Sequence, residues 1–124
     1  MGIIQKVIPM LQVDDKEVLA NAVTVFGVLA YNPENKKLIR EQDALEPIVA
    51  LLQHTDNEVL ERVCGTIQNL ALDGNLIEWY SWVVAENRVE FRQLDAIYPL
   101  AKLLDHNEPS VANTAASNFS FWNF

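Results

Sequence analysis

The sequence repeats one helical pattern, and this repetition constrains the fold more than any other feature. Residues 43–59 (DALEPIVALLQHTDNEV) return as residues 95–111 (DAIYPLAKLLDHNEPSV), and residues 2–18 (GIIQKVIPMLQVDDKEV) are a weaker copy. The weaker copy lies 41 residues before the middle one (59 − 18), and the last copy lies 52 residues after it (111 − 59). A helical pattern that recurs at about 40–47 residues predicts an all-α solenoid. Such proteins present extended binding surfaces.

The middle copy predicts three helices. Asn32 and Pro33 are typical of a helix start, and residues 33–42 then form a short helix. A second helix is predicted over residues 45–53, and a third over residues 58–71 with Asp56 or Asn57 as its cap. Between the first two helices stands Asp43, a residue type that tolerates left-handed backbone better than most. In the third helix one apolar stripe is predicted, formed by Val59, Val63, Ile67 and Leu70.

The same register organises the whole chain as a single domain, residues 1–124. Residues 2–30 correspond to the second and third helices of a unit, and residues 33–73 and 86–123 to complete units. The excess of eleven residues between the two complete units (52 − 41) falls within residues 74–86 and is interpreted as an insertion.

The three-helix order resembles the armadillo repeat family. The resemblance is carried by residues 44–52 (ALEPIVALL) and 66–71 (TIQNLA), and it covers nearly the whole chain outside the insertion. It implies a right-handed α-solenoid of about two and two-thirds repeats. Asp43 and Asp95 stand where family members usually carry glycine, which is a departure from the family pattern.

The resemblance also implies a binding surface. In this family the third helices line a concave groove for extended peptides, and an asparagine on that helix often bonds the peptide backbone. Asn69 occupies this position, but its counterparts are Val28 and Phe121, so the ladder of asparagines is broken on both sides. Gly65 stands where the nuclear-import receptors of the family have tryptophan. This difference argues against an import receptor.

Helical spacing extends the predicted groove around Asn69. The predicted groove residues are Asn21, Arg62, Gly65, Thr66, Asn69, Asp73 and Ser117. This surface is polar and nearly uncharged, which suits recognition of a peptide backbone; an ordinary solvated helix face is the alternative. Glycine inside a helix costs about 1 kcal/mol relative to alanine, and we attribute Gly65 to tight packing of the next repeat rather than to a ligand.

The insertion supplies a second candidate surface. Trp79, Tyr80 and Trp82 lie within it, and aromatic side chains dominate interface hot spots. The alternative is that this stripe lengthens a helix and packs on the solenoid itself, which is the interpretation we favour.

The C-terminal residues are also rich in aromatic side chains, with Phe119, Phe121, Trp122 and Phe124 in the last six positions. The first unit lacks its first helix, and about three repeats are needed for stable stacking. We therefore expect either a piece of a longer solenoid or self-association through these aromatic residues.

Several function classes are disfavoured. A net charge of −8 argues against nucleic acid and anionic membranes and favours a basic protein or peptide partner. Cys64 is the only cysteine and is predicted to be a buried apolar residue. His54 and His106 occupy equivalent turns that are too far apart to share a metal ion, so we interpret both as solvent-exposed turn residues. No motif for a metal, a cofactor or catalysis is present in the sequence.

The predicted function is therefore that of a non-enzymatic scaffold or adaptor that binds an extended peptide of a partner on its concave face. The alternative is a structural, cytoskeletal or axonemal assembly component, which would act by end-to-end stacking or by docking through the aromatic insertion. We expect a cytoplasmic location, with the nucleus or cytoskeleton as alternatives.

Overall fold

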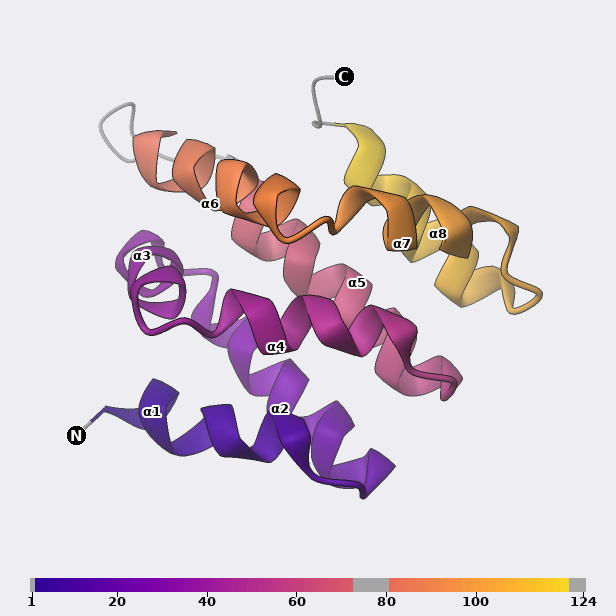
Figure 1. The fold of residues 1–124 in the computed structure, drawn as a ribbon, viewed down its shortest axis with the longest axis horizontal. Coiled ribbons are helices and arrows are strands. Elements are labelled where there is room, and N and C mark those ends of the chain that lie inside the picture. The colour runs from indigo at the N-terminus through magenta and orange to yellow at the C-terminus, as the bar shows by residue number, and fades with distance from the viewer. Residues whose placement is uncertain (1, 73–80, 121–124) are drawn as a thin grey trace.

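The computed structural model describes residues 2–72 and 81–120, which form a stack of helices (Figure 1). The elements are α1 (Ile3–Val7), η1 (Ile8–Gln12), α2 (Lys16–Leu29), α3 (Pro33–Glu41), α4 (Leu45–Ala50), η2 (Leu51–Gln53), α5 (Asn57–Ala71), α6 (Ser81–Gln93), α7 (Ile97–Lys102), η4 (Leu103–Asp105), α8 (Pro109–Ser117) and η5 (Asn118–Ser120), where η denotes a 3₁₀ helix. The helix predicted over residues 45–53 is thus α4 followed by the 3₁₀ turn η2.

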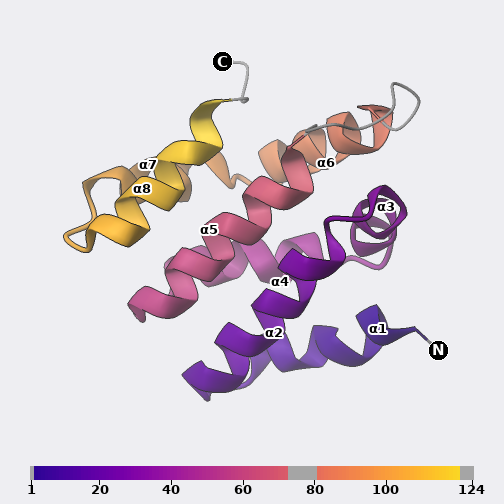
Figure 2. The same ribbon diagram turned by 180° about the vertical axis from the view of Figure 1, so that it is seen from behind.

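The helices form two layers and an edge. Figure 2 shows α2, α5 and α8 side by side, with α5 packed between the other two. In Figure 1 α1, α4 and α7 cover the opposite face of this layer, and α3 and α6 lie at one end of it. The all-α solenoid predicted from the repeats is confirmed, because each third helix packs on the third helix of the next unit.

Polar side chains cap the helices where the sequence predicts. The Asn32 side chain accepts a hydrogen bond from the backbone N–H of Glu34 (2.9 Å), and Pro33 follows as the first helical residue. Asp56 accepts from the backbone N–H of Val59 (3.1 Å), and α5 begins one residue earlier than predicted, at Asn57. These caps define where two of the three helices of the middle unit begin.

The breaks between first and second helices are left-handed. Asp43 and Asp95 both have a φ of 63°, so the chain turns there in the same way in both units. Most side chains disfavour this region, and a short polar side chain such as aspartate is better tolerated. The predicted break at these two positions is confirmed.

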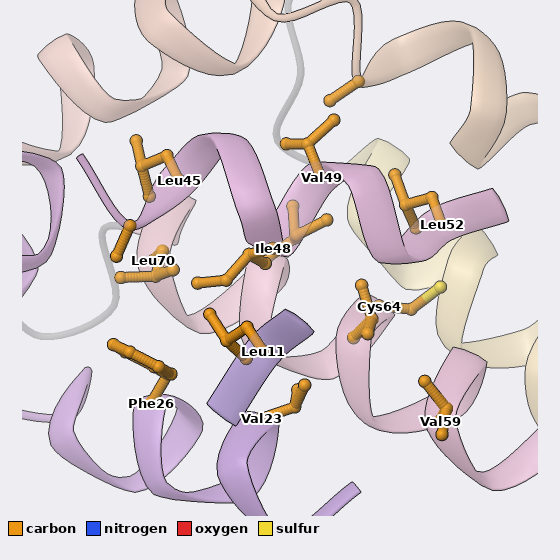
Figure 3. Close-up of a cluster of buried hydrophobic side chains, with 14 of the residues drawn as sticks. Leu11, Val23, Phe26, Leu45, Ile48, Val49, Leu52, Val59, Cys64 and Leu70 are labelled. Carbon is orange, nitrogen blue, oxygen red and sulfur yellow. The ribbon is translucent and has the colours of Figure 1, made fainter. Parts of the chain in front are cut away.

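The core lies between the layers. The predicted stripe of α5 is fully buried, and Figure 3 shows Val59 and Leu70 gathered with Leu11, Phe26 and Ile48 from three other elements. Cys64 is buried in the same cluster, as predicted. Burial, and secondarily the charge of Glu61, raises the pKa of its thiol to about 12.

Side chains from α3 and α6 donate hydrogen bonds to the backbone carbonyls at the end of α5. The last four carbonyls of a helix have no partner within the helix and must find one elsewhere when they are buried. The last three carbonyls of α5 and the carbonyl of Leu72, which follows the helix, accept side-chain hydrogen bonds. The pairs are Lys36 Nζ with Asn69 O and with Leu72 O (3.4 Å), Asn87 Nδ2 with Leu70 O (3.0 Å), and Arg88 Nε with Ala71 O (2.7 Å). The first helices of two units therefore converge on one helix end.

Two local features differ from the sequence interpretation. The first helix of the last unit, α6, begins at Ser81 rather than near residue 86, so it includes part of the segment assigned to the insertion. His54 and His106 are half-buried rather than free in solvent, so that interpretation was wrong. In each case Nδ1 accepts a hydrogen bond of 3.0 Å from the backbone N–H two residues later, which closes the turn before the third helix.

Candidate functional site

A seam of polar side chains joins the third helices α2 and α5. Three residues of α5 at positions i, i+4 and i+7 share one helix face, and each donates a hydrogen bond to a backbone carbonyl of α2. The pairs are Arg62 Nη1 with Ala20 O (3.1 Å), Thr66 Oγ1 with Val23 O (3.1 Å) and Asn69 Nδ2 with Gly27 O (3.2 Å). Three of the predicted groove residues therefore also hold two repeats together.

Arg62 is the charged member of this seam, and its charge is compensated. Its Nη2 lies 2.6 Å from Glu58 Oε1 on the same helix. Its Nη1 also donates to Thr24 Oγ1 (2.7 Å) and lies 3.4 Å from the Oδ1 of Asn21, which is exposed on α2. The guanidinium is thus fixed against α2 and carries no unpaired charge.

Asn69 is oriented by its contact with α2. Gly27 O can only accept, so the amide nitrogen of Asn69 must face it, which settles the direction of the carboxamide. Among the residues that the structure describes, none donates to Oδ1, and one N–H of the amide is also left over. Asn69 is half-buried. It therefore presents an acceptor and a donor in a fixed orientation.

A hollow of about 340 Å³ opens beside Asn69, between α2 and α5. Its walls include two apolar side chains that are largely exposed, Val28 (59%) and Tyr31 (74%). The complete lining is Thr24, Gly27, Val28, Tyr31, Arg62, Gly65, Thr66, Gln68 and Asn69. Sequence analysis did not assign Val28 or Tyr31 to the site, although Val28 aligns with Asn69 in the repeat register and could have been found in this way.

Gly65 lies in this lining and is not explained by packing. A Cβ atom placed on Gly65 would meet only Thr114 Cγ2, at 3.9 Å, which is an ordinary contact. The prediction that Gly65 is needed for tight packing of the next repeat is therefore wrong. Gly27 on α2 differs, because a Cβ atom there would lie 3.0 Å from Thr66 Oγ1. The close approach between α2 and α5 thus depends on Gly27.

Two other hollows are more charged. One of about 450 Å³ at the N-terminal ends of α2 and α5 shares Arg62 with the first and contains Glu17 and Asp56, so it continues the α2–α5 seam. The other, of about 500 Å³, lies between α3 and α6, where the nearly buried Arg40 pairs with Glu86 (2.7 Å). Burial raises the pKa of Glu90 in its wall. Of the three hollows, the one beside Asn69 is the least charged.

The remaining predicted residues lie apart from this hollow. Ser117, on α8, donates to the carbonyls of Asn113 (3.0 Å) and Thr114 (3.1 Å) within its own helix. Trp82, on α6, is 44% exposed, and the ammonium of Lys37 lies 5.3 Å from the centre of its ring. Asp73, Trp79, Tyr80, Phe121, Trp122 and Phe124 lie outside the residues that the structure describes.

Within residues 2–72 and 81–120, no three His, Cys, Asp or Glu side chains come together as ligands for a metal ion. No helix in the same ranges is both long and apolar enough to cross a lipid bilayer.

Comparison with known proteins agrees with this geometry. Residues 32–72 match the Armadillo/beta-catenin-like repeat family. A designed armadillo repeat protein is 28% identical and superposes with a TM-score of 0.76, over 93% of this chain and 48% of the designed one. Residues 32–72 are therefore an armadillo repeat, and the chain has the fold of an armadillo solenoid. The matched segment covers α3, α4 and α5, which is the unit from which the three-helix pattern was derived.

Two further armadillo proteins are similar over most of the chain. Human armadillo repeat-containing protein 3 is 29% identical over 111 residues, which are 90% of this chain but only 12% of the human protein. The chain therefore spans about an eighth of the length of that relative. A structure of computationally designed armadillo repeat proteins for modular peptide recognition is 28% identical, with a TM-score of 0.68, and covers 93% of this chain and 48% of that one.

Proposed function

We propose that this chain binds an extended peptide segment of a partner protein along the face formed by the third helices, with Asn69 as its polar anchor. One observation carries the proposal: Asn69 is held by Gly27 O and still presents an acceptor and an N–H beside an open hollow. The similar designed proteins made for modular peptide recognition support the same assignment.

The chemistry of an extended peptide suits this anchor. An extended backbone exposes alternating N–H and C=O groups that have no partner within the peptide. A carboxamide can pair with both kinds of group, and a side chain already fixed in place loses little conformational freedom on binding. Asn69 satisfies both conditions, because α2 holds it in one orientation. The adjoining hollow extends the surface, but its carboxylates Asp56 and Glu58 already pair with Lys16 (3.7 Å) and Arg62 (2.6 Å). A preference for a partner with basic residues therefore rests on the net charge of the whole chain, −8.

Selection of random peptides displayed on phage against the 124-residue chain, followed by calorimetry with a selected synthetic peptide, tests the proposal. We expect Asn69→Ala to weaken binding roughly tenfold, as for loss of a well-placed hydrogen-bond anchor. Asn113→Ala, an exposed asparagine on α8, is the matched control and should bind as wild type.

The unfolding midpoint of each variant is measured in parallel, so that loss of the Gly27 contact is separated from loss of binding. If every selected peptide binds Asn69→Ala and wild type equally tightly, the third-helix face is not the binding surface. A peptide whose binding is instead abolished by Trp82→Ala would place the site on α6.

A further inference from the structure

We propose that Gly65 is the floor of a side-chain subsite, which takes one bulky, uncharged apolar side chain of the bound peptide. This inference rests on the proposed function and adds the residue that determines specificity. The subsite is the hollow of about 340 Å³ between α2 and α5, with Val28 and Tyr31 as its apolar wall.

Gly65 has no structural reason to be glycine. It lies in the middle of α5, where glycine costs about 1 kcal/mol relative to alanine. Its backbone is that of a regular helix, and the nearest atom to an added Cβ is Thr114 Cγ2 at 3.9 Å. Neither strain nor packing therefore requires glycine here. What glycine does provide is open space on the face that carries Asn69.

The wall of the hollow offers apolar surface to a ligand. Val28 is 59% exposed and Tyr31 is 74% exposed, so both offer apolar surface that water now covers. Covering such surface is favourable, and aromatic residues at the centre of a contact contribute most to binding. A pocket of this size lies at the lower end of the volumes that hold small ligands, so it has room for one large side chain.

The charge in the hollow is already neutralised. Arg62 is the charged residue of the lining, and Glu58 neutralises it at 2.6 Å. A charged side chain entering this hollow would lose its hydration and find no partner of opposite charge. An uncharged apolar side chain avoids that cost. The subsite therefore selects a residue such as leucine, phenylalanine or tryptophan.

Asn69 and Gly65 are placed to act together. They are separated by four residues, so they lie one turn apart on the same face of α5. A peptide whose backbone bonds Asn69 is therefore held against the open position at Gly65. A single polar anchor beside a neutral apolar hollow fixes both the path of the peptide and the kind of side chain that fits.

The experiment combines variants of the protein and of a peptide selected on the 124-residue chain. On the protein side, Gly65→Ala and Gly65→Leu fill the floor in two steps, and Ala116→Leu places a leucine at an exposed position of α8 as the control. On the peptide side, the apolar residue is replaced by alanine. Calorimetry measures binding, and thermal unfolding measures the stability of each variant.

We expect a recurrent apolar position among the selected peptides. Gly65→Ala should raise the unfolding temperature, because alanine favours the helix and has room. Gly65→Leu should weaken binding of the apolar peptide by roughly tenfold or more. The alanine-substituted peptide should bind wild type and Gly65→Leu equally weakly, and Ala116→Leu should bind as wild type.

The possible results distinguish an error in the Gly65 subsite from an error in the proposed peptide binding. If Gly65→Ala lowers the unfolding temperature, glycine is needed for the fold and this inference is wrong. If Gly65→Leu binds the apolar peptide as tightly as wild type while Asn69→Ala does not, the subsite is wrong and the proposed function stands. If no selected peptide depends on Asn69, the proposed function fails and the subsite fails with it.

Discussion

Asn87 offers the sharpest test of how this fold is held together. Its side chain is fully buried on α6. Its Nδ2 donates to Leu70 O at the end of α5 (3.0 Å) and to Lys36 O in α3 (3.3 Å). One side chain thus joins three helices from two neighbouring units. Replacing it with alanine removes both hydrogen bonds and leaves the packing of the apolar core unchanged.

The expected magnitude follows from what each carbonyl loses. Leu70 O lies in the last turn of α5, and Asn87 Nδ2 is its donor among the described residues, so removing Asn87 leaves it a buried acceptor, which costs about 1–3 kcal/mol. Lys36 O lies inside α3 and keeps its helical partner, so its loss is smaller, about 0.5 kcal/mol. Asn87 Oδ1 is itself buried without a donor among the described residues, and its removal offsets part of the cost. We expect Asn87→Ala to lower the free energy of unfolding by about 2 kcal/mol.

Asn87→Asp separates this explanation from simple loss of volume. Aspartate has the same shape but presents a carboxylate to two carbonyl oxygens, so it should cost more than alanine, about 3 kcal/mol or more. Urea denaturation at pH 7 measures the free energy of unfolding of each variant. Asn113→Ala, on the exposed face of α8, is the control and should stay within about 0.5 kcal/mol of wild type. An aspartate variant that is as stable as wild type would refute the hydrogen-bond argument.

Three further predictions use the same assays. Asp43→Gly and Asp95→Gly should each raise the free energy of unfolding by about 0.5–1 kcal/mol, because both residues have a φ of 63°, which glycine adopts without steric cost. Lower stability would show that the aspartate side chains stabilise the fold by more than the left-handed backbone destabilises it. Gly27→Ala should lower the free energy of unfolding despite the better helix propensity of alanine, because the new Cβ would lie 3.0 Å from Thr66 Oγ1. A stabilised variant would mean that α2 and α5 can move apart without cost. Cys64 should resist alkylation at pH 8 in the native protein and react on unfolding, since burial raises the pKa of its thiol to about 12; rapid labelling of the native protein would contradict this. Because the folded state holds the thiol neutral, the stability contributed by its burial is complete below about pH 9 and is lost as the pH rises toward 12.

The features that sequence analysis predicted correctly depend on short-range patterns. Asp56 caps α5 because its side chain reaches a backbone N–H three residues away, and this is visible in sequence as a polar residue before an apolar stripe. The left-handed turns at Asp43 and Asp95 are visible in the same way, because the repeat aligns them at one break. These interactions involve only residues close in sequence.

The features that it missed depend on which helix lies next to which. Asn35 and Asn87 are aligned in the repeats, yet Asn35 is half-buried and Asn87 is fully buried. The difference arises because α6 packs against α3 and α5, whereas α3 is the first such helix in the described structure. Gly65 shows the same limit. Its neighbour Thr114 comes from the next unit, and the sequence contains no measure of the space between them.

The two seams of the third-helix layer differ in a way that bears on where a peptide is held. Between α2 and α5, three side chains donate across the seam. Between α5 and the α8–η5 segment, Asn118 Nδ2 of η5 donates to Cys64 O (3.1 Å), whereas Thr114 of α8, which aligns with Arg62, donates to Ser110 O (2.7 Å) within its own helix. Phe121, which aligns with Asn69, lies outside the residues that the structure describes.

A seam with more cross-links allows less relative movement of its two helices, so side chains that line it are better fixed before a ligand arrives. The hollow beside Asn69 lies on the α2–α5 contact, which three side-chain hydrogen bonds cross within the described residues. Hydrogen exchange should therefore show slower exchange at the α2–α5 contact than at the α5–α8 contact. Addition of a selected peptide should change exchange little at the first contact, since its groups are already positioned. Equal protection at both contacts before peptide is added would show that the cross-links do not preorganise the groove.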